Sequence, residues 1–242
     1  MNSTRNSHPY DLGNLPYLTD EQFIEFPDPT LFKNGIICYN GNLSPGILLS
    51  AYIQGIFAWY NPGDPIIWWS PDPRFVLLKD DFHVSKSTRK EIKRNERMNE
   101  EGNTAAITFT KDRDFKSVIE ACASVERKDQ NGTWITQEMQ EAFCELNRLG
   151  YAHSYEAWQN DELAGGFYGV RLGNCFFGES MFTKVSNATK MAFVKFAENF
   201  WMEGGKFIDS QVYTDNIARY GAKNISRTAY LRLLKDTLLS CN

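Results

Sequence analysis

The feature that most constrains the fold is a change of hydrophobic period after Gly150. From residue 151 to residue 182, apolar residues alternate with polar or small ones in three segments, YAHSYEAWQ, ELAGGFYGVRLG and NCFFGESMF. The pairs Asn160-Asp161 and Gly173-Asn174 separate the segments, and such pairs favour tight β-hairpins. Strands joined by hairpins form an antiparallel sheet, which the rest of the chain must cover.

Helical periodicity, capping residues and stop signals predict five helices around these strands. Their starts are marked by Ser44, by Ser85 or Ser87, by Thr136, by Ser186 or Asn187, and by Ser226. The first, third and fourth helices are predicted to end at Gly55, Gly150 and Gly204. KFIDSQVY is a further predicted strand. The pattern is that of an α+β fold with a mostly antiparallel sheet flanked by helices.

The stretch PIIWWSPDPRF divides the chain. Pro71 and Pro73 exclude a helix and favour extended backbone. We expect Trp68 and Trp69 to pack two domains together and Arg74 to open a basic region. The predicted division is a small N-terminal α+β domain at residues 1–70 and a larger domain at residues 71–242.

The composition argues against several classes of protein. No apolar run approaches the roughly 18 residues of a membrane span, and the polar start of the sequence lacks the apolar core of a secretion signal. Five cysteines without a CxxC pair indicate reduced thiols in a cytoplasmic protein. Three scattered histidines, without an HxxxH or HExxH motif, predict no metal site.

The charge of the chain is unevenly distributed. The net charge of −4 argues against a general nucleic-acid binder. Between Arg74 and Arg97, however, eight Lys or Arg residues stand against four Asp or Glu. The helical period places six of these cations on one face, namely Lys86, Arg89, Lys90, Lys93, Arg94 and Arg97. Such a face is either a solvated helix surface or a phosphate-binding surface, and the shortage of acidic partners favours the second.

Three polar residues stand among apolar neighbours in predicted strands. Asp209 and Gln211 are two residues apart in FIDSQV and would share a face of a strand. They are hydrogen-bond partners with a structural role, or they bind a ligand. Glu179 lies in FFGESMF, where alternation places it on one face with Phe177 and Met181. A buried acid at that place needs solvent or a cation.

Two tryptophans lie next to predicted loops. Trp59 precedes a Pro-Gly turn, and Trp134 lies in NGTWIT. Tryptophan at such a place stacks on nucleic-acid bases or packs partly buried against the fold. The pattern alone leaves both interpretations open.

Six motifs occur in this order along residues 43–234: GIFAWYNPGDPIIWWSPDPR, GTWIT, GYAHSYEAW, GGFYGV, FFGESMF and FIDSQV. Together they resemble the bacterial leucyl/phenylalanyl-tRNA–protein transferases. The resemblance implies transfer of Leu or Phe, and less readily Met, from aminoacyl-tRNA to the N-terminal Arg or Lys of a protein. The product is then marked for degradation by the N-end rule pathway. The resemblance also implies a small N-terminal domain joined to a larger domain like the GNAT acyltransferases, with no cofactor.

The resemblance assigns roles to individual residues. Trp59 and Trp134 would hold the terminal adenosine of the tRNA, and the Lys86–Arg97 face would bind its acceptor stem. Asp209 and Gln211 would lie at the reaction centre, with Glu179 beside them. The pocket for the donor side chain would be formed by Phe167, Met181, Phe193, Phe196 and Ile208. Strict alternation turns Ile208 away from Asp209, so its place in the pocket depends on the resemblance alone. We expect a monomer without metal or membrane contact.

The sequence departs from the family pattern at a few places. Ala58 stands where proline is expected and Ser210 where cysteine is common, but no residue assigned to the chemistry is replaced. Two alternative functions stay open. One is a CoA-dependent N-acyltransferase of similar fold, although no CoA-binding loop of the Q/R-x-x-G-x-G/A kind stands out. The other is a non-catalytic tRNA-binding module.

Overall fold

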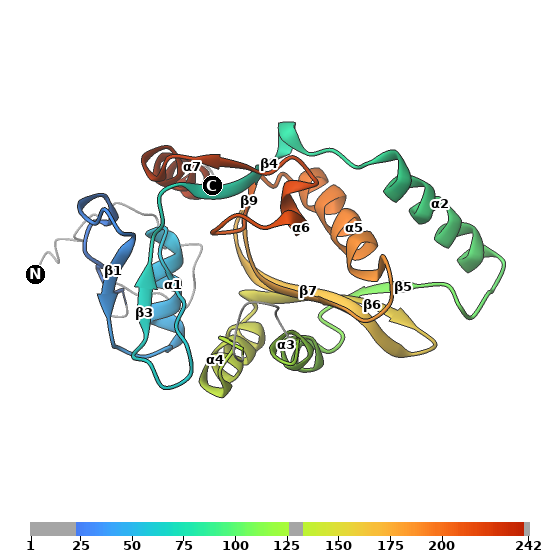
Figure 1. Cartoon of the computed structure of the whole chain (residues 1–242), viewed down its shortest axis with the longest axis horizontal. Helices are drawn as coiled ribbons and strands as arrows, with labels where there is room; N and C mark the ends of the chain where they lie inside the picture. The colour runs from blue at the N-terminus through green and yellow to red at the C-terminus, as the bar shows by residue number, and fades with distance from the viewer. Residues whose placement is uncertain (1–22, 126–132, 240–242) are drawn as a thin grey trace, which may run out of the picture.

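The computed structural model describes residues 23–125 and 133–239. They form two β-sheets with helices around them (Figure 1). The small sheet has the strand order β1-β3-β2, made by β1 (Ile36–Tyr39), β2 (Phe57–Ala58) and β3 (Ile67–Trp69). We call residues 23–69, which contain this sheet, the small-sheet region.

The large sheet has the strand order β10-β4-β9-β8-β7-β6-β5. Its strands are β4 (Arg74–Leu78), β5 (Thr108–Lys111), β6 (Ala152–Gln159), β7 (Glu162–Leu172), β8 (Cys175–Thr183), β9 (Phe207–Asp209) and β10 (Lys223–Ile225). Neighbouring strands are antiparallel except for β8 and β9. The two predicted hairpins join β6, β7 and β8, and Asn160 and Asp161 have the left-handed φ angles, 52° and 59°, of a type I′ turn. The predicted α+β fold with a mostly antiparallel sheet is confirmed.

The helices are α1 (Pro45–Ile53), α2 (Lys86–Glu100), α3 (Phe115–Ala123), α4 (Gln137–Arg148), α5 (Ala188–Met202), α6 (Asp215–Ala218) and α7 (Arg227–Leu239). Short 3-10 helices lie at Pro29–Leu31 and Lys79–Asp81. Ser85 and Thr136 cap α2 and α4 as predicted, because their side chains accept the backbone N–H groups of Thr88 and Met139. The free cysteines of the described residues are Cys38, Cys122, Cys144 and Cys175; Cys241 lies outside the described residues.

Helices cover both faces of the large sheet. Figure 1 shows α5 across one face with α2 outside it, and α3 and α4 against the other face. The alternation of β7 explains the two layers, because Phe167 packs on Phe193 of α5 whereas Tyr168 packs on Phe115 of α3 and Phe143 of α4. The sheet is therefore buried on both sides.

The ring contacts and side-chain hydrogen bonds of the two tryptophans of the PIIWWSPDPRF stretch join residues of the small-sheet region, and Trp68 is also part of a buried cluster that extends to Val76 of β4 and Tyr230 of α7. The ring of Trp68 lies 5.1 Å from that of Phe26, and its Nε1 donates to the carbonyl oxygen of Asn40. Trp69 donates to the carbonyl oxygen of Trp59 at 2.7 Å. The small-sheet region also reaches α7, where Gly55 packs so closely that an added Cβ would lie 2.5 Å from Leu231.

Candidate active site

A cavity of about 570 Å³ lies between the small-sheet region and the large sheet, and we name it the central pocket. Its lining comes from β2 and the residue after it, from β7, β8, β9, α5 and α6, and from the segment before α4. Nine residues predicted for the site line it: Trp59, Trp134, Phe167, Glu179, Met181, Phe193, Ile208, Asp209 and Gln211. The fold thus brings together residues that are up to 152 positions apart.

Phe196 is the predicted pocket residue that does not line the central pocket. Its ring lies behind the wall, 5.3 Å from that of Phe167 and 4.5 Å from that of Phe176. Phe176 lines the central pocket instead, together with Ile217 of α6. Neither Phe176 nor Ile217 was predicted, because a buried aromatic strand residue and a single isoleucine in a short helix carry no distinctive sequence pattern.

An irregularity in β8 sets the direction of Glu179. The residue pairs between β7 and β8 skip Glu179, so it is the extra residue of a β-bulge. Before the bulge, Phe177 faces α1, where its ring lies 5.0 Å from that of Tyr52. After the bulge, Met181 lines the central pocket with Glu179. Tyr52 also bonds to Glu179, whereas Met181 lies opposite Phe167 of β7, which packs on α5. The prediction that Phe177, Glu179 and Met181 share one face is therefore wrong for Met181.

Asp209 is completely buried at the end of β9. Arg74 of β4 donates to both of its carboxylate oxygens, with Nη2 2.6 Å from Oδ2 and Nε 2.9 Å from Oδ1. The hydroxyl of Tyr230 donates to Oδ2 at 2.8 Å, and the backbone N–H of Gln211 donates to Oδ1 at 2.9 Å. Both oxygens of Asp209 are therefore held by donors from three separate segments.

Arg74 is also completely buried, so the prediction that it opens the basic surface is wrong. Its guanidinium lies 4.8 Å from the ring of Phe57 and 4.4 Å from that of Tyr230, and Nη1 donates to the carbonyl oxygen of Gly55. Burial lowers the pKa of Arg74, but the charges of Asp209 and Tyr230 and the hydrogen bonds to both side chains together more than offset this and raise it above its ordinary value. The ion pair is a fixed part of the pocket floor.

Gln211 lies outside the strand in which it was predicted. β9 ends at Asp209, and Gln211 has a left-handed φ of 56°, so the strand alternation that would place both side chains on one face does not apply. Its backbone N–H bonds to Asp209, whereas its side-chain Nε2 lies 3.4 Å from Oε1 of Glu179. Non-glycine residues with such φ angles concentrate at functional sites.

Glu179 differs from Asp209 in its partners. The hydroxyl of Tyr52, from α1, donates to its Oε1 at 2.9 Å, and the other bond is the long one from Gln211. The pKa of Glu179 is raised to about 8, chiefly by burial and also by the charge of Asp209, while the Tyr52 hydrogen bond and the charge of Arg74 act to lower it. The central pocket therefore contains a carboxyl group that exchanges a proton near neutral pH.

The two predicted tryptophans lie on the lining of the central pocket. Trp59 is 37% exposed, and its ring lies 5.8 Å from that of Trp69. Trp134 is buried, with 9% of its surface exposed. Trp69 holds Trp59 in place through this ring contact and through the hydrogen bond to its carbonyl oxygen, and its role at a domain contact stays a prediction.

The basic face of α2 is separate from the central pocket. Five of the six predicted cations line an open groove, together with Glu96 and Glu100: Lys86, Arg89, Lys90, Lys93 and Arg97. Arg94, the sixth, lies 3.9 Å from Glu91. In Figure 1, α5 lies between α2 and α6, so the cations and the central pocket are on different sides of α5.

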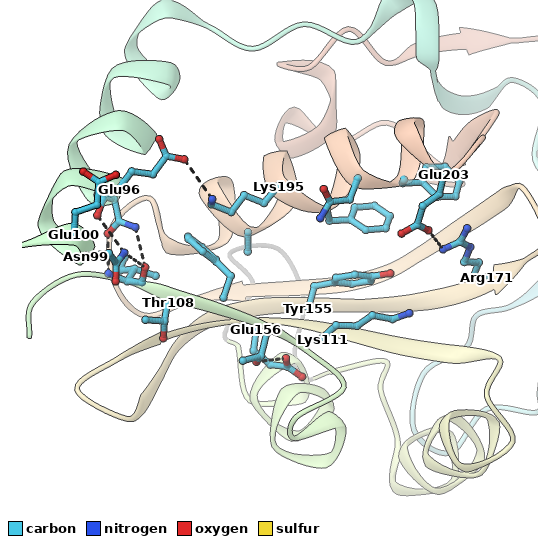
Figure 2. Close-up of a pocket in the computed structure, with 18 residues that line it drawn as sticks. Glu96, Asn99, Glu100, Thr108, Lys111, Tyr155, Glu156, Arg171, Lys195 and Glu203 are labelled. Atoms are coloured by element: carbon cyan, nitrogen blue, oxygen red, sulfur yellow. Dashed lines mark hydrogen bonds and ion pairs between the residues drawn. The ribbon is translucent and has the colours of Figure 1, made fainter. Parts of the chain in front are cut away.

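A second cavity of about 630 Å³ lies between α2, α5 and the strands β5 and β6, and we name it the outer pocket. Figure 2 shows acidic and basic side chains around an aromatic floor. Two ion pairs lie on its lining, Lys195 with Glu96 at 3.4 Å and Arg171 with Glu203 at 2.5 Å, and the Glu156 carboxylate accepts hydrogen bonds from Thr110 and Ser154. Phe196 lines this cavity rather than the central pocket.

Two further observations concern the part of the chain that the structure describes. Residues 23–125 and 133–239 contain no group of three or more His, Cys, Asp or Glu side chains that could hold a metal ion. Within the same ranges, none of the helices has both the length and the apolar character needed to cross a bilayer.

The fold and the central pocket define an α+β protein with a cavity whose lining combines two tryptophans, an apolar end and two acidic side chains. Two family models match the chain. The model of the leucyl/phenylalanyl-tRNA protein transferase covers residues 76–235, and that of the N-terminal domain of the same protein covers residues 41–72.

Curated relatives match over most of their own length. The leucyl/phenylalanyl-tRNA–protein transferase of Lawsonia intracellularis is 46% identical over 91% of this chain and 92% of its own length. That of Syntrophus aciditrophicus is 46% identical over 93% of this chain and 90% of its own length. That of Myxococcus xanthus is 47% identical over 90% and 89%. The chain belongs to the leucyl/phenylalanyl-tRNA–protein transferase family, as the sequence motifs predicted.

Among solved structures, L-PGS from Bacillus licheniformis matches with a TM-score of 0.38 at 12% identity, over 69% of this chain and 65% of its own. A likeness of this size carries no argument about function. Family membership therefore depends on the sequence relatives.

Proposed function

We propose that the chain transfers Leu or Phe, and less readily Met, from aminoacyl-tRNA to the N-terminal Arg or Lys of acceptor proteins, which marks them for N-end rule degradation. The composition of the central pocket supports this most directly. A tryptophan pair, an apolar end and two acidic side chains line a single cavity, and these groups suit an adenosine, an apolar side chain and a cationic amine respectively.

The predicted roles fit the positions of the side chains. Trp59 and Trp134 would hold the terminal adenosine, because aromatic rings provide stacking surfaces for bases. The donor side chain would lie among Phe167, Met181, Phe193 and Ile208, with Phe176 completing the apolar end and Phe196 supporting the wall from behind. A methylene more or less in such a pocket changes binding by only about 1–3 kcal/mol, which is consistent with acceptance of Leu, Phe and Met.

The reaction centre would consist of Asp209, Gln211 and Glu179. An aminoacyl-tRNA is an activated ester, so peptide-bond formation with an amine needs no further activation by ATP. Asp209 would fix Gln211 through the backbone N–H, and the Gln211 carboxamide oxygen would accept a hydrogen bond from the attacking amine. Binding both substrates beside each other would supply much of the rate enhancement.

The organisation of the chain fits the same function. The larger domain, residues 71–242, would be a GNAT-like aminoacyltransferase domain, and residues 1–70 a small domain that closes the central pocket with Trp59 and its neighbours. We expect the enzyme to act as a cytoplasmic monomer without a cofactor.

The basic face of α2 would bind phosphates of the tRNA. Replacement of both Lys90 and Arg94 by Glu is expected to weaken tRNA binding. It should also reduce the steepness of the slope of log affinity against log salt concentration by about one to two, since each lost phosphate contact removes roughly 0.7–0.9 from that slope. Filter binding across salt concentrations measures this. The matched control reverses Arg232 and Lys235 on α7, both exposed, and an equal loss in the control would exclude a specific role of α2.

The deciding experiment is a transfer assay. The protein is incubated with Phe-tRNA and peptides that begin with Arg, Lys or Ala, without ATP or CoA. We expect a Phe–peptide bond with the Arg and Lys peptides and none with the Ala peptide. Absence of transfer with retained tRNA binding would indicate a non-catalytic tRNA-binding module. Saturable acetyl-CoA binding would indicate a CoA-dependent acyltransferase.

A further inference from the structure

We propose, on the basis of the transfer activity proposed above, that Glu179 takes up the proton of the acceptor amine and that Tyr52 of the small-sheet region is the residue that positions it. Tyr52 was not predicted as part of any site, because the sequence places it only on the apolar face of a helix. Its hydroxyl nevertheless reaches across to β8 and donates to Oε1 of Glu179 at 2.9 Å.

The first step concerns the choice between the two acidic side chains. Asp209 accepts hydrogen bonds at both oxygens from Arg74, Tyr230 and Gln211, so an incoming proton would have to displace a buried ion pair. Such a displacement is costly, because it leaves the guanidinium without its partner. Among residues 23–125 and 133–239, the donors at hydrogen-bond distance from Glu179 are the uncharged Tyr52 and Gln211, and Glu179 lines the same pocket.

The second step concerns the rigidity of Tyr52. It is 2% exposed, and its ring is packed 5.0 Å from that of Phe177. A phenol fixed at its ring can hold its hydroxyl in one position without loss of side-chain entropy during the reaction. Because Glu179 lies in a β-bulge, where the strand ladder does not fix it, the Tyr52 hydrogen bond decides where the carboxylate points.

The proton balance follows from the reaction. The acceptor arrives as an ammonium and passes one proton to the Glu179 carboxylate, which leaves a neutral amine. The amine nitrogen then forms a bond to the ester carbonyl carbon, and the bond from that carbon to the 3′-oxygen of the tRNA breaks. The second proton of the nitrogen goes to the departing 3′-oxygen, and the first leaves Glu179 for solvent.

The pH dependence depends on the groups that face Glu179. These are Tyr52 from α1, Asp209 from β9, Arg74 from β4 and the uncharged Gln211. The hydrogen bond from Tyr52 lowers the pKa of Glu179, because it stabilises the carboxylate. Loss of the hydroxyl therefore moves the ionisation of Glu179 to higher pH, and activity that requires the carboxylate moves with it.

The test compares three variants in the transfer assay between pH 6 and pH 9, after subtraction of spontaneous ester hydrolysis. Glu179→Gln is expected to slow transfer about 10²–10⁴-fold, the usual contribution of a general base. Tyr52→Phe is expected to shift the rising limb of the rate profile up by about one pH unit, since a hydrogen bond to a charged group contributes about that much. Its rate at pH 7 falls roughly tenfold and recovers at high pH.

Tyr60→Phe is the matched control. Tyr60 also belongs to the small-sheet region, and its hydroxyl reaches Thr136 and Glu138 at 3.4 Å rather than Glu179. The control is expected to keep the wild-type pH profile. Wild-type activity in Glu179→Gln would overturn the proton transfer, and an unshifted profile in Tyr52→Phe would overturn the positioning role. Absence of transfer by the wild-type protein would instead refute the proposed function itself.

Discussion

The central pocket and the outer pocket have similar volumes, about 570 and 630 Å³, but their charges are arranged differently. In the outer pocket, the acidic side chains Glu96 and Glu203 are paired with Lys195 and Arg171 at its edge. In the central pocket, Arg74 is bound to Asp209, and within the part of the chain that the structure describes no cation lies at hydrogen-bond distance from Glu179. Volume therefore does not distinguish the two cavities. The outer pocket also contains Glu156, whose two carboxylate oxygens accept hydrogen bonds from Thr110 and Ser154. Among the described residues, Glu179 instead accepts hydrogen bonds at Oε1 alone, from Tyr52 and Gln211.

The two pockets share a wall of aromatic rings. Tyr155, which lines the outer pocket, is stacked on Phe167, which lines the central pocket, at a centroid distance of 5.0 Å. Phe196 fills the space behind both rings. A substitution on one side of this wall should therefore affect only the cavity that it faces, which makes the comparison testable.

The largest expected effect comes from Asp209→Ala. Removal of the carboxylate leaves Arg74 buried without a partner, which costs about 3–5 kcal/mol of folding stability. It also releases Gln211, so we expect transfer to be lost while the folded fraction still binds tRNA. Glu203→Ala is the matched change in the outer pocket, where the ion pair is partly exposed, and it should cost at most about 1 kcal/mol. Urea unfolding measures both, and equal losses would contradict the comparison.

The sequence predicted the fold well where local signals agree with the tertiary structure. The hairpins of β6, β7 and β8 carry alternation and turn pairs, and Ser85 and Thr136 carry capping signals that the structure confirms. The strands β1, β2, β3, β4, β5 and β10 and the helices α3 and α6 were not predicted. β4 is apolar on both faces, because it lies inside the sheet between β9 and β10, and such a run has no period from which a strand can be identified.

The candidate site was predictable only in part, since the motifs named residues but not their contacts. Strand alternation fails at Glu179 because of the bulge, and at Gln211 because β9 has already ended. The partners Tyr52, Arg74 and Tyr230 lie 127, 135 and 21 positions from the acids that they hold. Hydrogen bonds of this kind depend on the packing of separate elements, which a local sequence pattern does not contain.

An intermediate effect is expected from two leucine substitutions on α5. Phe193 lines the central pocket, whereas Phe200, seven residues later, lines the outer pocket. Both are buried, so replacement by Leu should destabilise the protein to a similar degree, about 1–3 kcal/mol. Only Phe193→Leu should raise KM for Phe-tRNA, by roughly tenfold, and Phe200→Leu should leave KM within about twofold. A similar rise of KM in both variants would show that the wall does not separate the pockets.

The smallest expected effect is on the pH dependence of stability. The pKa of Glu179 is about 8 in the folded protein and 4.5 in its ordinary range. Between these values the unfolded chain gives up the proton first, so the contribution of Glu179 to stability is complete below pH 4.5 and is lost as the pH rises through 8. Glu179→Gln should remove this fall, which makes the variant more stable than the wild type at pH 8 relative to pH 5, by at most about 3 kcal/mol. Urea unfolding at the two pH values measures the difference. Glu203→Gln in the outer pocket leaves Glu179 in place, so this variant should lose stability between pH 5 and pH 8 as the wild type does. A loss of stability that persists in Glu179→Gln would mean that another group causes it.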